Sequence, residues 1–503
     1  MPMTRSDRLW LALIMVIVLA WQVPLFGRTK AGQDENFYGV PGMMILRTGL
    51  PQIPYIPSRD PETIYYHSDE VLYTLPPLGF YLEAAVHLVL GDGLGPARMA
   101  SMIAGLVAVL IVCDLARRWS GSRRAALLAA ASYLFSRAFL FPATTARPDM
   151  AAIAFGLGAV WSVSRDDRRW RDVVLGGALA GLSMLCHPLG LVPTAQVGLA
   201  LLVGNRCWKR KLGEATAYSV VALAAFGLWL PMIALHPELF RIQFGGNVLD
   251  RAGPGLGETI LALPGVVAFQ SWNAFDHVGP IQGGLYGLGT LWLMREVGRG
   301  ADRGRLRRVL FHAVAAVVLL VLVMGRHHIR NYYGYPAALL SVPVGLMLDR
   351  LASRLGAKVG STRATAIVAA ALVLAMVPGS GLRVLGAHLR HWDDPNYRVG
   401  PFVDRIAADL PPGALVAADG SYVLEFFLRD RPVVEAIVDP FYYNVRLEPF
   451  EYAVFGPIGL EQIRPEIEGL ELVRTYGDRD DPFGLYAELY RRVRADSGER
   501  SEL

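Results

Sequence analysis

The segment LWLALIMVIVLAWQVPLFGRTKAGQDEN, residues 9–36, decides the fold class of this chain. Its first part, Leu9–Phe26, has no charged residue and approaches the roughly 20 apolar residues that a helix needs to cross a bilayer. No small-residue cleavage motif follows, so we expect a retained span and not a removed signal peptide. Directly after it stands Gln33-Asp34-Glu35-Asn36, with two adjacent carboxylates. The segment therefore predicts a membrane protein with acidic groups beside one membrane face.

The rest of the chain repeats these apolar blocks. Of its 503 residues, 53% are hydrophobic and 18% are charged, whereas soluble domains carry about 25% charged residues. The apolar residues form blocks of roughly 17–22 instead of amphipathic stripes, which is typical of membrane-spanning helices. We predict a polytopic α-helical membrane protein with about eleven spans by hydropathy. The candidate spans are Leu9–Phe26, Ala97–Ala116, Ala125–Phe141, Met150–Val163, Val173–Cys186, Leu189–Val203, Thr216–Leu235, Val278–Met294, Val309–Met324, Tyr332–Leu348 and Ala364–Val377.

Five short loops between these spans are strongly basic, and basic loops stay on the cytoplasmic side of a membrane. All five fall on that side only if Leu75–Leu90 does not cross the bilayer. This segment opens with Pro76-Pro77 and carries Glu83 and His87, so we expect a juxtamembrane helix lying along the outer face. The formal net charge of +5 arises in such loops and predicts no nucleic-acid partner. The basic loops are Arg117–Arg124, Arg165–Arg171, Arg206–Lys211, Arg295–Arg308 and Arg350–Arg363.

The same topology places two acidic groups at the extracytoplasmic face, the first of which is Asp34 with Glu35. An ionised Asp34 could act there as a general base toward an acceptor hydroxyl or amine, with Glu35 beside it, or could bind a cation. The alternative is an ordinary pair of loop acids. A second group, His67, Asp69 and Glu70, either contacts an acceptor or belongs to the loop alone. Its spacing fixes no metal geometry, so we predict no metal site, and a divalent cation stays open as a cofactor.

Cationic residues at this face predict a site for an anion. Arg147 and Asp149 lie between two candidate spans, and the guanidinium suits either Asp149 or a phosphate. His187 lies in a tight turn, as a ligand or as a polar turn residue. The cluster at residues 326–333 breaks the usual charge rule, so a lipid-linked phosphate is expected to compensate it, with general anchorage to lipid headgroups as the alternative. The residues assigned to phosphate binding are Arg147, His187, Arg326, His327, His328, Arg330, Tyr332 and Tyr333.

The composition of the tail is that of a soluble domain. We expect helices at Val399–Ala408 and Tyr422–Leu428, alternating with short strands, which predicts a small α/β domain at residues 391–503 behind a transmembrane domain at residues 1–390. It has no Gly-rich phosphate loop and no nucleophile elbow, which favours an accessory or lid role. The expected strands lie within Ala414–Ala418, Pro432–Val438, Tyr452–Phe455, Leu472–Tyr476 and Gly484–Tyr490.

Several motifs in order resemble one family. Pro76-Pro77-Leu78, Ala97-Arg98, Ala146–Met150 (Ala-Arg-Pro-Asp-Met) and Gly181–Gly190 lie within Gln33–Pro193, and the similarity recurs at Asn331–Pro336. Together they resemble the GT-C membrane glycosyltransferases of the protein O-mannosyltransferase and lipid A aminoarabinose transferase kind, which are glycosyltransferase family 39-like.

The resemblance implies a polyprenyl-phosphate-linked sugar donor and a lipid, glycan or protein acceptor that approaches from outside a bacterial inner membrane. It implies that Asp34 acts as base or positions the acceptor, that Asp149 is the second acid, and that the residues near Arg326–Tyr333 hold the donor phosphate. Stabilising the charge of that leaving phosphate would then matter most for rate. The sequence departs from the family at two places. Thr74 and Leu75 stand before Pro76, where the aminoarabinose branch carries a lysine, and His187 stands where many relatives carry lysine.

Two other classes of protein compete with this interpretation. A transporter or flippase of a lipid-linked substrate would show repeated halves and charged or broken helices at mid-membrane, whereas the ionisable residues here gather at one face. A non-catalytic assembly protein would use the tail to bind cell-envelope partners. The sequence favours the transferase.

Overall fold

The computed structural model describes residues 3–32, 34–165, 167–203, 206–250, 256–299, 303–327, 330–377 and 381–493. Its α-helices are α1 (Arg5–Gln22), α2 (Glu35–Tyr38), α3 (Pro41–Thr48), α4 (Leu78–Leu90), α5 (Leu94–Ser120), α6 (Arg123–Leu134), α7 (Arg137–Thr144), α8 (Asp149–Val163), α9 (Trp170–Cys186), α10 (Leu191–Val203), α11 (Trp208–Phe226), α12 (Leu230–Leu235), α13 (Pro237–Phe244), α14 (Leu256–Leu261), α15 (Leu263–Val278), α16 (Pro280–Arg299), α17 (Arg303–Met324), α18 (Gly334–Val359), α19 (Ser361–Met376), α20 (Leu382–Arg390), α21 (Val399–Ala408), α22 (Val423–Phe427) and α23 (Pro457–Gln462). The strands are β1 (Val416–Ala418), β2 (Val433–Glu435), β3 (Val438–Asp439), β4 (Tyr443–Asn444), β5 (Tyr452–Phe455), β6 (Leu470–Gly477) and β7 (Tyr486–Arg492).

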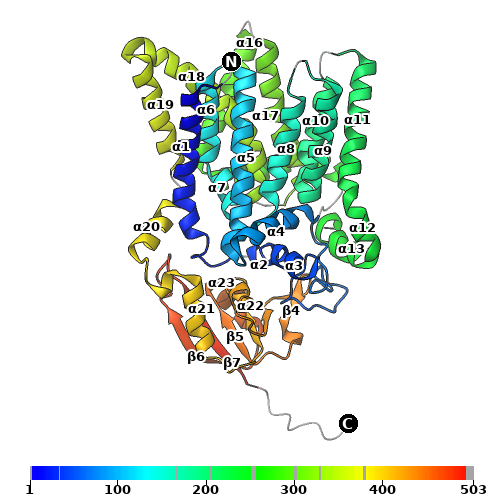
Figure 1. Cartoon of the computed structure of the whole chain (residues 1–503), viewed down its shortest axis with the longest axis vertical. Coiled ribbons are helices and arrows are strands. Elements are labelled where there is room, and N and C mark those ends of the chain that lie inside the picture. The colour runs from blue at the N-terminus through cyan, green and yellow to red at the C-terminus, as the bar shows by residue number, and fades with distance from the viewer. Residues whose placement is uncertain are drawn as a thin grey trace.

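The long apolar helices stand side by side in one bundle, and the strands form a separate layer at one end of it (Figure 1). Between the two lie α2, α3 and α4. By length and composition, four single helical segments of the described chain could each cross a membrane, or five if α6 and α7 count as one bent span. Four further apolar helices are shorter, among them α4 and α8. The chain is an integral membrane protein, and the number of eleven spans stays a prediction.

One predicted element has the shape that its sequence suggests, and a second is bent where one span was expected. The segment predicted to lie along the membrane is α4, a helix of 13 residues that runs across the end of the bundle (Figure 1). At about 1.5 Å per residue it is shorter than a hydrocarbon core. The predicted span at residues 125–141 is not straight, because Ser136 caps a new helix and α6 and α7 meet at a bend of 57°.

Small residues let the helices of the bundle approach closely. A Cβ atom added at Gly181 in α9 would lie 2.3 Å from the carbonyl oxygen of Ala222 in α11, and one at Gly177 would lie 2.6 Å from that of Tyr218. Helices that cross a membrane gain little from the hydrophobic effect against one another, so backbone contact through glycine supplies packing.

The tail forms a small domain around a five-stranded sheet. The strand order is β2-β1-β5-β7-β6, with β1 parallel to β2 and β5, and with β7 antiparallel to β5 and β6. A separate two-stranded sheet joins β3 and β4. Helix α21 begins and ends at the predicted residues, and β5 does as well. The predicted α/β character of the tail is confirmed.

This small domain shares a hydrophobic core with the segment that follows the first span. Tyr55 and Phe80 from that segment belong to the same buried cluster as Phe402 and Phe426 of the tail. Backbone bonds reinforce the contact, since the Glu435 amide donates to the Tyr55 carbonyl oxygen at 2.8 Å. Burial of large aromatic side chains in one cluster fixes the two parts against each other.

Candidate functional site

Arg147 lies at the centre of the predicted site, between α7 and α8. Its Nε donates to Oδ2 of Asp149 at 2.7 Å, and its Nη1 donates to Oδ2 of Asp34. The side chain of Arg147 is 8% exposed and that of Asp149 is fully buried, whereas that of Asp34 is 52% exposed. The structure thus joins the two predicted acids through one guanidinium, and only Asp34 faces outward.

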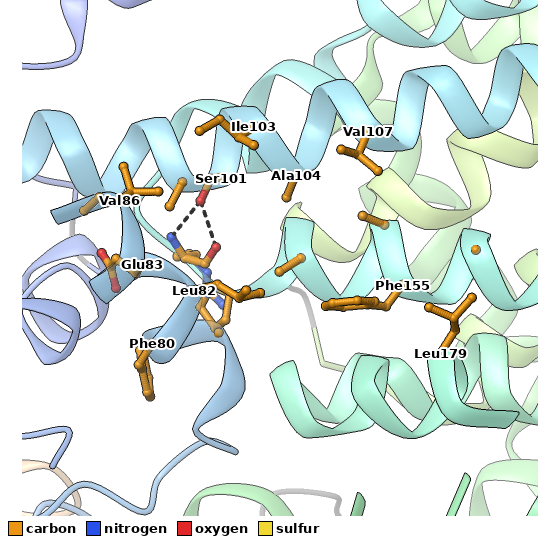
Figure 2. A pocket seen from close by; sticks show the side chains of 18 of the residues that line it. Phe80, Leu82, Glu83, Val86, Ser101, Ile103, Ala104, Val107, Phe155 and Leu179 are labelled. Carbon is orange, nitrogen blue, oxygen red and sulfur yellow. Dashed lines mark hydrogen bonds between the residues drawn. The ribbon is translucent and has the colours of Figure 1, made fainter. Parts of the chain in front are cut away.

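The backbone around Arg147 is fixed by a residue of α5. The Ser101 hydroxyl donates to the carbonyl oxygen of Arg147 at 2.9 Å and accepts from its amide at 3.4 Å, as the dashed lines in Figure 2 show. Asp149 begins α8, where a carboxylate is favoured by the helix dipole. The guanidinium also lies over the ring of Tyr38, with 5.1 Å to its centroid.

His187 and Tyr332 extend this group. Nδ1 of His187 accepts from the Leu189 amide at 3.0 Å, so the proton of the neutral ring lies on Nε2. Nε2 is 3.7 Å from Oδ1 of Asp149 and 3.4 Å from the Tyr332 hydroxyl. Burial lowers the pKa of His187 to about 4, because the attraction of Asp149 only partly offsets it. His187 is therefore neutral near neutral pH, and its Nε2 donates to the Tyr332 hydroxyl while lying beside Asp149.

Glu35 is fully engaged in a buried ion pair. Its carboxylate accepts from Arg98 Nε at 2.8 Å and Nη2 at 2.7 Å, and from the amides of Gly32 and Ala146, each at 2.8 Å. Burial alone would raise its pKa, but the Arg98 charge and these hydrogen bonds hold the pKa below its ordinary value. Since both oxygens are occupied, the geometry favours a positioning role for Glu35 over a catalytic one.

The predicted phosphate cluster at residues 326–333 is divided by the fold. Arg326 and His327 are exposed, and His328 lies outside the described residues. Tyr333 donates to Gln270 at 2.9 Å. Arg330 lines a separate cavity of about 320 Å³ together with Arg137 and Glu35. Of this cluster, the contacts described place Tyr332 against His187.

The second acidic group stands apart from this site. Ligand atoms of His67, Asp69 and Glu70 lie within 4.8 Å of one another, a spacing that could hold a metal ion. Arg59 already forms a bidentate pair with Asp69, at 2.8 Å for both bonds, and Glu70 accepts from His67 at 2.7 Å. These contacts satisfy the acids within the loop.

Sequence reasoning missed several residues around the site. Arg98 was noted only as part of a motif, although its Nη1 and Nη2 also bind the carbonyl oxygens of Phe26 and Lys30 at 2.8 and 2.9 Å and so shape the loop that carries Asp34. Asn36 donates to Glu435, a buried acid 399 residues later in the chain. An arginine at the start of a span was the available signal for Arg98, and nothing local marked Glu435.

Two cavities meet at Arg147 and Asp34. An apolar groove of about 530 Å³, lined by α4, α5, α8 and α9, includes Arg147 (Figure 2). A second cavity of about 380 Å³ includes Asp34 and Tyr38. The ion pair between Arg147 and Asp34 therefore connects the lining of one cavity with that of the other.

Known proteins resemble the chain in sequence and in fold. A family model described as dolichyl-phosphate-mannose-protein mannosyltransferase matches residues 74–234. The undecaprenyl phosphate-alpha-4-amino-4-deoxy-L-arabinose arabinosyl transferase 1 of Pseudomonas fluorescens is 28% identical over 272 residues, which cover 50% of this chain and 44% of that protein. The chain thus matches less than half the length of this relative.

Solved structures match over nearly the whole chain. ArnT from Cupriavidus metallidurans bound to undecaprenyl phosphate has a TM-score of 0.61 at 18% identity, covering 97% of this chain and 98% of that one. The oligosaccharyltransferase of Archaeoglobus fulgidus in complex with Zn and sulfate has a TM-score of 0.56 at 15% identity, covering 96% and 73%. The chain therefore has the GT-C fold, as its motifs predicted, and residues 74–234 are similar in sequence to the mannosyltransferase family.

Proposed function

We propose that this protein transfers a sugar from a polyprenyl-phosphate-linked donor to an acceptor at the extracytoplasmic face of a bacterial inner membrane. The observation that carries this proposal is the charge chain from Asp34 through Arg147 to Asp149, which lies between an apolar groove and an outward cavity. The relatives named above, which include arabinosyl transferases and a mannosyltransferase family, support the same reaction class.

The apolar groove suits the polyprenyl chain of the donor. Figure 2 shows Leu82 of α4, Ile103 and Val107 of α5, and Phe155 of α8 around it. Leu82, Ile103 and Val107 are 38%, 48% and 44% exposed, so the groove opens toward the lipid hydrocarbon. An isoprenoid chain in this groove would place its phosphate at Arg147. Because Nε and Nη1 pair with the two acids, Nη2 is left for a phosphate oxygen.

The charge chain gives each residue a role in a single displacement. The acceptor oxygen attacks C1 of the sugar, the C1–O bond to phosphate breaks, and polyprenyl phosphate leaves with that electron pair. Asp34, the exposed acid, takes the acceptor proton. Arg147 offsets the developing phosphate charge, and buried Asp149 fixes the orientation of the guanidinium. The guanidinium lies between the two carboxylates and offsets part of their charge.

The membrane orientation follows from the basic loops. Another cavity lies where the ends of α5 and α8 meet the start of α17. It is lined by Arg117, Arg118, Arg165, Arg305 and Arg308. These loops belong at the cytoplasmic side by the positive-inside rule. The C-terminal domain and α2, which begins directly after Asp34, lie at the opposite end of the bundle (Figure 1), which supports an extracytoplasmic site and domain.

The test is sugar transfer by the full-length protein in nanodiscs, with undecaprenyl-phosphate aminoarabinose as donor and an outer-membrane glycolipid extract as acceptor. Mass spectrometry follows donor loss and product gain. We expect Asp34→Asn to lower transfer by about 10²–10⁴-fold, the usual contribution of a general base. The control is Asp92→Asn, an exposed loop acid paired only with Arg47 among the contacts described. Equal transfer by Asp34→Asn and the wild type contradicts the proposal, and movement of intact donor across the membrane without transfer supports the transporter alternative.

A further inference from the structure

The cavity that contains Asp34 is built mostly from two distant parts of the chain. The segment after the first span contributes Lys30, Phe37 and Tyr38, and the C-terminal domain contributes residues of β2, β3 and α23 and of the loops beside them. The C-terminal residues with polar side chains are Asp419, Ser421, Glu435, Asp439, Tyr442 and Gln462. The C-terminal domain thus supplies one wall of the cavity that Asp34, the candidate base, also lines.

The charge of this wall is unusual for a site beside a phosphate donor. Asp34, Asp419, Glu435 and Asp439 bring four carboxyl groups, and Lys30 is the cation among the described lining residues. The phosphate-facing cation, Arg147, lines the apolar groove on the other side of Asp34. The charged side chains that a phosphate would meet in this cavity are therefore mostly acidic, and those that are ionised repel it.

Glu435 presents a polar atom to this cavity. Its side chain is buried, at 2% exposure of the residue, and Oε1 accepts from Asn36. Oε2 is buried and has no hydrogen-bond partner among the described residues. Burial raises the pKa of Glu435 well above its ordinary value, which the Asn36 hydrogen bond only partly offsets and the charge of Asp419 reinforces. Burial thus favours the protonated form of this carboxyl group, in which Oε2 donates a hydrogen bond.

Aromatic rings also line this cavity. Phe37 and Tyr65 stack at 5.0 Å between centroids, and Tyr65 lies 6.2 Å from Tyr442. Flat rings with hydroxyl groups offer apolar faces to the C–H side of a sugar ring, while carboxyl and amide groups bind its hydroxyls. Sites for small molecules typically combine aromatic side chains with a small number of polar groups that fix the orientation of the ligand.

We propose that this cavity binds the acceptor, and that the accepting end is a neutral, hydroxyl-rich saccharide instead of a phosphorylated headgroup. This inference rests on the proposed function, because it uses Asp34 as the base. The C-terminal domain then determines which acceptor reaches Asp34, and the groove on the other side holds the donor.

The test is saturation-transfer difference NMR on the full-length protein in nanodiscs. The probes are a panel of neutral disaccharides built from glucose, mannose, galactose and N-acetylglucosamine, each paired with its phosphomonoester. Undecaprenyl phosphate binding is measured on the same preparation. We expect saturation transfer to at least one neutral probe and about tenfold weaker binding of its phosphomonoester, equivalent to roughly 1.4 kcal/mol.

Variants separate the cavity from the fold. Tyr442→Ala and Glu435→Leu should each weaken binding of the neutral probe about tenfold, which is the effect of one lost contact in a buried site. Glu435→Gln should retain binding, because the glutamine amide donates a hydrogen bond as the protonated carboxyl group of Glu435 does. The matched control is Glu461→Gln, an exposed acid of the same domain that does not line the cavity. Normal undecaprenyl phosphate binding in each variant shows that the bundle is intact.

The outcomes divide cleanly. Stronger binding of a phosphomonoester, unchanged binding in Tyr442→Ala and Glu435→Leu, or no saccharide binding by a protein that still binds undecaprenyl phosphate overturns the inference. If the wild-type protein does not bind undecaprenyl phosphate, this result contradicts the proposed function instead.

Discussion

Replacing Arg98 by methionine should destabilise the protein strongly and displace the loop that carries Asp34. Arg98 donates to both oxygens of Glu35 and to the carbonyl oxygens of Phe26 and Lys30. The side chains of the pair are 6% and 4% exposed. Arg98→Met leaves the Glu35 carboxylate buried without its counter-charge, and breaking such a pair from one side costs about 3–5 kcal/mol.

The assay is reversible unfolding in SDS followed by tryptophan fluorescence, for Arg98→Met, Glu35→Gln and the double variant. Each single variant should lose about 3–5 kcal/mol, and the double variant should lose less than the sum because the two residues act as a unit. The control is Arg47→Met, whose pair with Asp92 is exposed and should be worth about 0–1 kcal/mol. Equal small losses at Arg98 and Arg47, or additive losses in the double variant, refute the reasoning.

The same pair predicts a dependence on pH. The folded-state pKa of Glu35 is lowered from 4.5, so its contribution to stability is present above that value and is lost as pH falls through the folded pKa. The difference in unfolding free energy between wild type and Glu35→Gln should therefore shrink on acidification below pH 4.5.

Three further predictions concern the site and the bundle. Burial holds the pKa of His187 at about 4, so the ring should not titrate between about pH 6 and pH 8. The pH profile of the transfer rate should therefore be the same for the wild type and His187→Gln in this range. A change in the wild-type rate that the variant lacks would count against a neutral ring. Arg147→Lys cannot bridge both acids, so undecaprenyl phosphate measured by native mass spectrometry should bind about tenfold more weakly, and unchanged affinity would exclude Arg147 as the phosphate ligand. Gly181→Ala should lower the free energy of unfolding in SDS by about 1–3 kcal/mol, because the added methyl group overpacks against α11. Gly198→Ala has nothing within 4 Å of the added methyl group and should raise the free energy of unfolding by about 0.5–1 kcal/mol. Equal effects of the two substitutions would contradict the close packing.

The sequence predicted the features that depend on residues close together in the chain. Apolar blocks predicted the helices, and local residue patterns in the tail predicted α21 and β5 to the residue. The basic loops, together with Pro76-Pro77, Glu83 and His87, predicted that α4 does not span the membrane. Asp34, Arg147 and Asp149 were selected by motif and by membrane face, and the structure brings them into one charge chain.

The features that could not be predicted depend on contacts between distant segments. Glu435 reads as an ordinary strand residue, and only the docking of the tail onto the first loop buries it against Asn36. Residues 326–333 looked like one phosphate cluster, but a single turn there directs Tyr332 toward His187 and Arg330 into another cavity. Charge and spacing alone do not fix which way consecutive side chains point at a helix end.

The most direct test of the account is where the donor lipid binds. A photoreactive undecaprenyl phosphate with a diazirine in its chain, added to the full-length protein in nanodiscs, should label Ile103, Val107 or Phe155 in the groove of Figure 2. Excess undecaprenyl phosphate should abolish this labelling, and Arg147→Lys should weaken it. Labelling confined to α16 or α19, neither of which lines the groove, would contradict the claim that the donor reaches Arg147 along α5 and α8.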